Sequence, residues 1–177
     1  MGTETESISH GNALGIFSER IFTVRRVSVH SSSPYEEVVE KLEAAVHFLD
    51  PNNKERRVEA STGKDLRSAI EQLAQPSGFV LLAKIDHSLL ERLGREGRSV
   101  QYAIGNPLVA AELTSHDAAI GLYAPFRLAV LEDRALSGAV MLFDDPADLM
   151  GSFGNEHAAA IGEELSIKIR ELIESLI

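Results

Sequence analysis

The chain has 177 residues, of which 44% are hydrophobic and 25% charged, which predicts one globular domain long enough to bury a core. It has no cysteine, which excludes disulfides, thiolate metal ligands and cysteine nucleophiles, and its net charge of -10 argues against nucleic acid or a membrane as a partner. No apolar run approaches the ~18 residues of a membrane helix, and the polar start lacks the regions of a secretory signal, so we expect a soluble, cytoplasmic protein.

The first part of the chain predicts a flexible N-terminal arm at residues 1–19, followed by a single α+β domain at residues 20–177. Residues 21–30 are rich in β-branched side chains and predict a strand. A helix then begins at a capping box, with Ser33 at the N-cap and Glu36 three residues later. Its apolar residues fall on one helical face, namely Val38, Val39, Leu42, Val46 and Leu49.

The middle of the chain continues with a polar loop at residues 51–63 and a second amphipathic helix that ends before Pro76. The nearly continuous apolar run from Gly78 to Asp86 predicts a buried central strand. Asp86 is expected to cap a short helix that contains three leucines.

A strand at residues 100–104 leads into Asn106-Pro107, where Asn106 caps a helix and Pro107 takes the first helical position. Alternating apolar residues then predict a strand over residues 119–131, and Pro125 within it indicates an edge position or a bulge.

The C-terminal part predicts a strand at residues 138–143, which forms a hairpin with the preceding strand, and a long amphipathic helix from Asn155. The order of all these elements predicts an α+β fold. We expect a mixed β-sheet of about five strands with helices packed mainly on one face, which is a two-layer sandwich.

Three stretches, GFVLLAKIDHSLLERLG, YAIGNPLVAAEL and AAIGLYAPFRLAVLED, resemble the domain-of-unknown-function family three hundred and two. The resemblance covers about residues 25–176 and implies a compact α+β fold, often a homodimer, with no settled reaction. Relatives commonly carry a Cys at the position of Gly105 and a Pro-Cys at Pro125-Phe126, so no thiol role carries over. Compared with these relatives, residues 51–75 look like an insertion.

Tyr123 and Arg127 are the first candidates for ligand binding. Four residues apart on the expected strand, they would share a face at a spacing of roughly 13 Å, and both can hydrogen-bond a polar or anionic group. The alternative is a solvated face on which Arg127 pairs with Glu132 or Asp144. The helix N-terminus at Asn106 lies near the same sheet end and either holds an anion or is a plain cap.

His87, the fourth candidate, follows the expected central strand and is either a general base or a structural residue. The six histidines are scattered, with no two at helical metal spacing, so we predict neither a metal nor a cofactor. The sequence also lacks a Gly-rich phosphate loop, a G-x-S-x-G elbow and H-E-x-x-H, and it assigns no catalytic residue.

These observations favour a small-molecule-binding domain with a ligand cleft beside the Tyr123/Arg127 strand. One alternative is a cofactor-independent lyase, isomerase or cyclase that uses His87, Tyr123 or Arg127. The other is a structural or regulatory homodimer without a ligand. We expect a homodimer because the final helix and the hairpin each offer an apolar stripe. A pocket that holds these polar groups would favour the first two functions, and a filled core the third.

Overall fold

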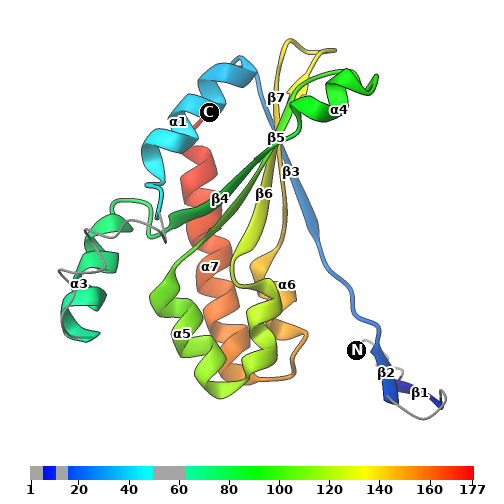
Figure 1. The fold of residues 1–177 in the computed structure, drawn as a ribbon, viewed down its shortest axis with the longest axis vertical. Helices are drawn as coiled ribbons and strands as arrows, with labels where there is room; N and C mark the ends of the chain where they lie inside the picture. Colours follow the sequence, from blue (N-terminus) through cyan, green and yellow to red (C-terminus); the bar gives the residue numbers. More distant parts are fainter. Residues whose placement is uncertain (1–5, 11–15, 50–62) are drawn as a thin grey trace.

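The computed structural model describes residues 6–10, 16–49 and 63–177, which form two β-sheets and a layer of helices (Figure 1). The larger sheet has the strand order β3-β7-β6-β5-β4 and is antiparallel throughout. Its strands are β3 (Arg26–Ser31), β4 (Val80–Asp86), β5 (Ser99–Gly105), β6 (Phe126–Asp133) and β7 (Gly138–Asp144). A separate antiparallel pair, β1 (Glu6–His10) and β2 (Ile16–Arg20), lies within the expected N-terminal arm.

The helices gather mainly on one face of the large sheet, where α1 and α7 run along it (Figure 1). They are α1 (Tyr35–Ala45), α3 (Gly63–Leu73), α4 (Ser88–Arg92), α5 (Pro107–His116), the 3-10 helix η1 (Ala118–Tyr123), α6 (Pro146–Gly151) and α7 (Glu156–Glu174). None of the helices in the described ranges is long and apolar enough to cross a membrane. The α+β sandwich expected from the sequence is confirmed, except that the sheet is antiparallel and not mixed.

The core lies between the large sheet and the helices α1 and α7. On α1, Val38, Leu42 and Val46 are buried as their spacing predicts, and α7 buries its own apolar stripe against the sheet. At the sheet centre, Tyr102 is fully buried and its hydroxyl donates a hydrogen bond to Glu43 Oε1 at 2.6 Å. Burial, followed by this hydrogen bond, raises the pKa of Tyr102, so the phenol stays neutral.

The apolar run at β4 forms an edge strand and not the central strand that the sequence predicts. Its first residues, Phe79, Val80 and Leu81, are buried, whereas Ile85 is 51% exposed. An isolated parallel bridge between Phe48 and Leu81 covers the outer edge of the strand at its buried end. A strand covered in this way looks in sequence like one with neighbours on both sides.

The strand expected at residues 119–131 begins later, because η1 occupies its first part. The side chain of Asp117 caps η1 by accepting a hydrogen bond from the Ala119 amide at 2.9 Å. Pro125 comes just before β6, which is the central strand of the sheet, so it marks neither an edge nor a bulge. Apolar alternation cannot separate these cases, since Ile120 is buried from a 3-10 helix as well as it could be from a strand.

Asn106 and Asn155 cap α5 and α7 as the sequence predicts. The capping box at Ser33 does not form, because Pro34 occupies the N-cap of α1 and Glu36 pairs with Arg98 instead. The predicted loop at residues 51–63 lies almost wholly outside the described residues, and the second half of the predicted insertion contains α3.

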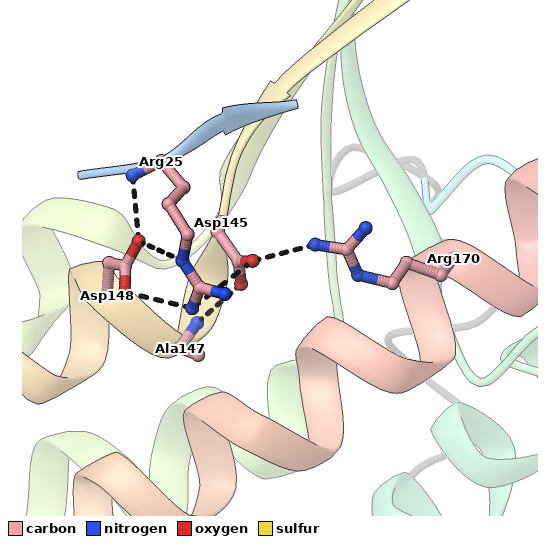
Figure 2. A network of polar contacts seen from close by, with 5 residues as sticks. All are labelled: Arg25, Asp145, Ala147, Asp148 and Arg170. Carbon is pink, nitrogen blue, oxygen red and sulfur yellow. Dashed lines mark hydrogen bonds and ion pairs between the residues drawn. The ribbon is translucent and has the colours of Figure 1, made fainter. Parts of the chain in front are cut away.

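Asp145 is a buried carboxylate that joins three elements through contacts with two partly exposed arginines (Figure 2). Its side chain is fully buried, caps α6 at the Ala147 amide, and accepts a hydrogen bond from the Arg170 guanidinium at 2.8 Å. Arg25 lies 3.5 Å from the same carboxylate and donates two side-chain hydrogen bonds to Asp148, at 2.8 and 2.9 Å. The network ties the segment before β3 to α6 and α7, next to the layer that holds the main pocket.

Candidate functional site

The main pocket lies where α5 leaves the sheet, between α5, the end of η1, α6 and α7. Its volume is about 210 Å³. Nearly all of its lining is apolar, and the side chains are Leu82, Pro107, Val109, Ala110, Leu113, Phe126, Met150 and Leu165. Gly105, Asn106, Tyr123, Ala124 and Pro125 complete the wall, so two of the four predicted ligand residues line one pocket.

Asn106 positions the wall of the pocket, and its side chain is already used. Its Oδ1 accepts from the Leu108 amide at 2.9 Å, which caps α5, and its Nδ2 donates to the Gly78 carbonyl at 3.1 Å. The amide therefore joins the start of α5 to the segment before β4. Both of its polar atoms have partners, so the cap interpretation fits better than direct contact with a ligand.

Tyr123 supplies the polar group of the pocket. Its ring is held between the edges of Phe22 and Phe153, with centroid distances of 6.4 and 5.8 Å. Within the described ranges its hydroxyl has no hydrogen-bond partner, and the residue is half-buried. A fixed phenol at the rim of an apolar pocket can orient one polar atom of a ligand.

Arg127 lies outside this pocket, although it is close in sequence to Tyr123. Tyr123 ends η1, whereas Arg127 is an exposed residue of β6 on the face of the sheet away from α1 and α7. The two residues line only a small common hollow of about 40 Å³. The alternative salt bridges are not formed either, because Glu132 pairs with Arg98 and Asp144 with Arg26.

His87 lies at the opposite end of the sheet from the pocket. It directly precedes α4, and its Nδ1 is 3.0 Å from Ser99 Oγ. Ser99 is the first residue of β5, and Gly105, which lines the pocket, is its last. His87 is therefore not brought together with Tyr123 or Asn106.

No group of three or more His, Asp or Glu side chains that could hold a metal ion is found among the described residues. The nearest approach of two histidines is that of His116 and His157, with ring centroids 4.6 Å apart. Folding brings them together from α5 and α7, and Glu112 Oε1 lies 3.1 Å from His157 Nε2. Their separation in sequence gave no sign of this contact.

Sequence reasoning missed most of the apolar lining of the pocket. One signal was available in α5, where residues 107–111 carry no charge and Leu113 alone is fully buried. A helix that is apolar beyond its core-facing residue has a further surface to cover. The contributions of Met150 and Leu165 come from distant elements and leave no such signal.

Comparison with known proteins gives the family and the fold. A family model described as "Domain of unknown function DUF302" matches residues 55–176. The crystal structure of an uncharacterized conserved DUF302 protein from Bacillus stearothermophilus is similar, with a TM-score of 0.63 and 15% sequence identity, over 86% of this chain and 98% of that chain. No curated protein matches the sequence.

Proposed function

The chain belongs to the DUF302 family of domains of unknown function, and we propose that it is a small-molecule-binding domain whose ligand occupies the pocket at the start of α5. The observation that carries the proposal is a hollow of about 210 Å³ with an apolar lining in which Tyr123 supplies a phenol side chain. A cavity of roughly 150 Å³ in a protein core is large enough to bind benzene. The pocket therefore has room for a molecule somewhat larger than benzene.

The chemistry of the lining defines the class of ligand. Apolar walls favour a compact hydrocarbon group, such as one aromatic ring or a short branched chain. Tyr123 favours a single hydroxyl or carbonyl oxygen on that group, since its hydroxyl can both donate and accept. None of the described residues that line the pocket is a Lys or Arg, so they offer a strongly anionic group no counter-charge.

Binding is favoured over catalysis by the separation of the polar candidates. A cofactor-independent lyase, isomerase or cyclase needs an acid and a base within reach of one substrate. Tyr123 is at the pocket, Arg127 is on the other face of the sheet, and His87 is at the far end of β5. Among the described residues of the lining, the polar side chains are those of Asn106, whose amide is engaged, and Tyr123.

The absence of cysteine allows a direct test of pocket occupancy. A Cβ at Gly105 would lie 3.5 Å from Pro125 and 3.9 Å from Leu82, so Gly105→Cys adds a thiol to the wall at ordinary contact distance. Gly151 in α6 has no neighbour within 4 Å of such a Cβ, and Gly151→Cys is the matched control.

Each variant is alkylated with iodoacetamide in the presence of benzene, phenol or indole at increasing concentration. We expect these probes to slow alkylation at least tenfold in Gly105→Cys and to leave the rate of Gly151→Cys unchanged. Equal rates with and without every probe, at concentrations near their solubility, would contradict the proposed pocket.

A further inference from the structure

The face of the large sheet away from α1 and α7, here called the open face, carries no long helix within the described residues (Figure 1). On the central strand β6, Leu128 and Val130 point to the core and are fully buried, whereas the alternate residues Ala129 and Leu131 remain partly exposed. The neighbouring strands continue this apolar surface with Ile85, Ala103, Val140 and Leu142. An antiparallel sheet can leave one face to water, but exposed apolar side chains grouped in this way are typical of a surface that binds a partner.

The charge of the open face distinguishes it from the rest of the molecule. The whole chain has a net charge of -10, so most of its surface repels another copy. The open face carries Arg26 and Arg127 together with Asp133 and Asp144, and these two positive and two negative charges cancel. A second copy can therefore approach this face without the repulsion that it meets elsewhere.

The pattern along β6 fits a second copy in one orientation. Its open-face residues read Arg127, Ala129, Leu131, Asp133, which is positive, small, large, negative. We propose that the chain forms a homodimer in which two open faces pack together about a twofold axis that crosses β6 at Val130. This axis exchanges the two halves of the pattern, so that Arg127 faces Asp133 of the partner subunit and Leu131 faces Ala129 of the partner subunit.

Two further observations support this arrangement. A shallow hollow of about 290 Å³ lies on the open face, with Ala129, Leu142 and Gln101 in its lining, and it can receive the Leu131 side chain of the partner subunit. In the described part of the chain, Arg127 forms no ion pair, because Asp144 pairs with Arg26 and Asp133 lies 3.6 Å from His30. The dimer gives this arginine a carboxylate.

The area of the open face reaches the lower limit for a specific interface. Five strands at about 4.8 Å spacing and strands of six to eight residues give a face of roughly 20 Å by 25 Å. Two such faces bury on the order of 1,000 Å², which is about the lower bound for a specific interface.

The test exchanges the large and small residues of β6. Ala129→Leu places leucine against leucine at both symmetry-related contacts, and Leu131→Ala leaves two holes, so each change alone should raise the dimer dissociation constant at least tenfold. Because the axis exchanges positions 129 and 131, the double variant Ala129→Leu/Leu131→Ala should recover the dissociation constant of the unchanged protein to within about threefold. Ile167→Ala on the outer side of α7, which is 57% exposed, is the control and should have no effect.

Sedimentation equilibrium on the full-length protein measures these constants. At 50 μM we expect the unchanged chain to have about twice the monomer mass of 19.3 kDa. A monomer at that concentration, or a double variant that is as weak as the two single changes combined, would overturn the proposal. A dimer that no open-face variant weakens would also overturn it, since another surface would then be responsible.

Cross-linking of single-cysteine variants tests the direction of the axis. An axis across the strands separates the two copies of position 127 by about 20 Å along β6, and the two copies of position 129 by only about 7 Å. A short bismaleimide should therefore link Ala129→Cys into a covalent dimer but leave Arg127→Cys unlinked. A link in Arg127→Cys would indicate an axis parallel to the strands and would overturn the arrangement.

Discussion

At the scale of single residues, the hydroxyl of Tyr123 is expected to contribute to ligand binding and not to folding. Among the described residues it has no hydrogen-bond partner, so Tyr123→Phe should change the free energy of unfolding by no more than ~0.5 kcal/mol. For phenol, the loss of one hydrogen bond of about 0.5–1.5 kcal/mol predicts a two- to tenfold weaker affinity, while benzene should bind equally well. Isothermal titration calorimetry of both probes against both proteins measures the difference. An equal loss of affinity for phenol and benzene would mean that the substitution moved the ring of residue 123 and did not act through the hydrogen bond.

Asp145 is expected to contribute to folding far more than its neighbour Asp144. Asp145 is fully buried between Arg25 and Arg170, and its removal leaves both guanidinium groups without that partner and α6 without its cap. Both guanidinium groups remain partly exposed to water, so Asp145→Ala removes mainly the helix cap and a charge-assisted hydrogen bond, which we predict to cost roughly 2–4 kcal/mol in urea unfolding. Asp144 pairs with Arg26, whose side chain is 68% exposed, so Asp144→Ala should cost no more than about 1 kcal/mol. Similar losses in the two variants would contradict the role of burial.

At the scale of elements, the sequence predicted most helices and strands from their caps and periods, although the capping box at Ser33 does not form. Asn106-Pro107 at α5 and Asn155 at α7 are side-chain caps that the structure contains. The failures occur where one pattern fits two structures. The apolar residues before Phe126 fit a strand and a 3-10 helix equally, and the run in β4 fits a central strand and a covered edge.

The same limit applies to the candidate site. Asn106 was found because an Asn-Pro pair marks the start of a helix, and Tyr123 because it was expected to share a strand face with Arg127. The pocket brings Asn106 and Tyr123 together. The pairing of Tyr123 with Arg127 depended on a continuous strand between them. Since η1 ends at Tyr123, the two-residue period that placed them on one face does not apply.

The contact between the segment before β3 and α6 should be sensitive to acid. The hydrogen bonds from the Arg25 side chain, opposed in part by burial, lower the pKa of Asp148 below its usual value of 3.8. A lowered pKa in the folded state means that the stabilisation is fully present above the unfolded pKa and is lost as pH falls through the folded one. The difference in unfolding free energy between the unchanged protein and Asp148→Asn should therefore be constant above pH ~5 and shrink below pH ~4. Urea melts from pH 6 to 2.5 measure it, and a constant difference down to the lowest pH would contradict the assignment.

At the scale of the whole molecule, the sheet separates two surfaces with different proposed roles. The pocket lies among the helices at one end of the sheet, and the open face lies on the other side. Leu128 and Val130 fill the core between them, and both are fully buried. A rigid layer that no ligand contact crosses should transmit little coupling between the two surfaces.

Independence of ligand binding and dimerisation is therefore the prediction for the intact protein. Ala110→Leu places three additional carbon atoms in the pocket, so it should abolish phenol binding but leave the dimer dissociation constant unchanged. Ala129→Leu should weaken the dimer and leave phenol affinity unchanged.

The thermal stability of the three proteins measures the effect of phenol. At a phenol concentration of 100 times its dissociation constant, binding should stabilise both the unchanged protein and Ala129→Leu by about 2.7 kcal/mol, which raises Tm by roughly 5–10 °C. The Tm of Ala110→Leu should not rise. Differential scanning calorimetry and sedimentation equilibrium on the same three proteins separate the two effects. If Ala129→Leu lost both dimerisation and phenol binding, the pocket would depend on the dimer, and the two surfaces of the sheet would be energetically coupled.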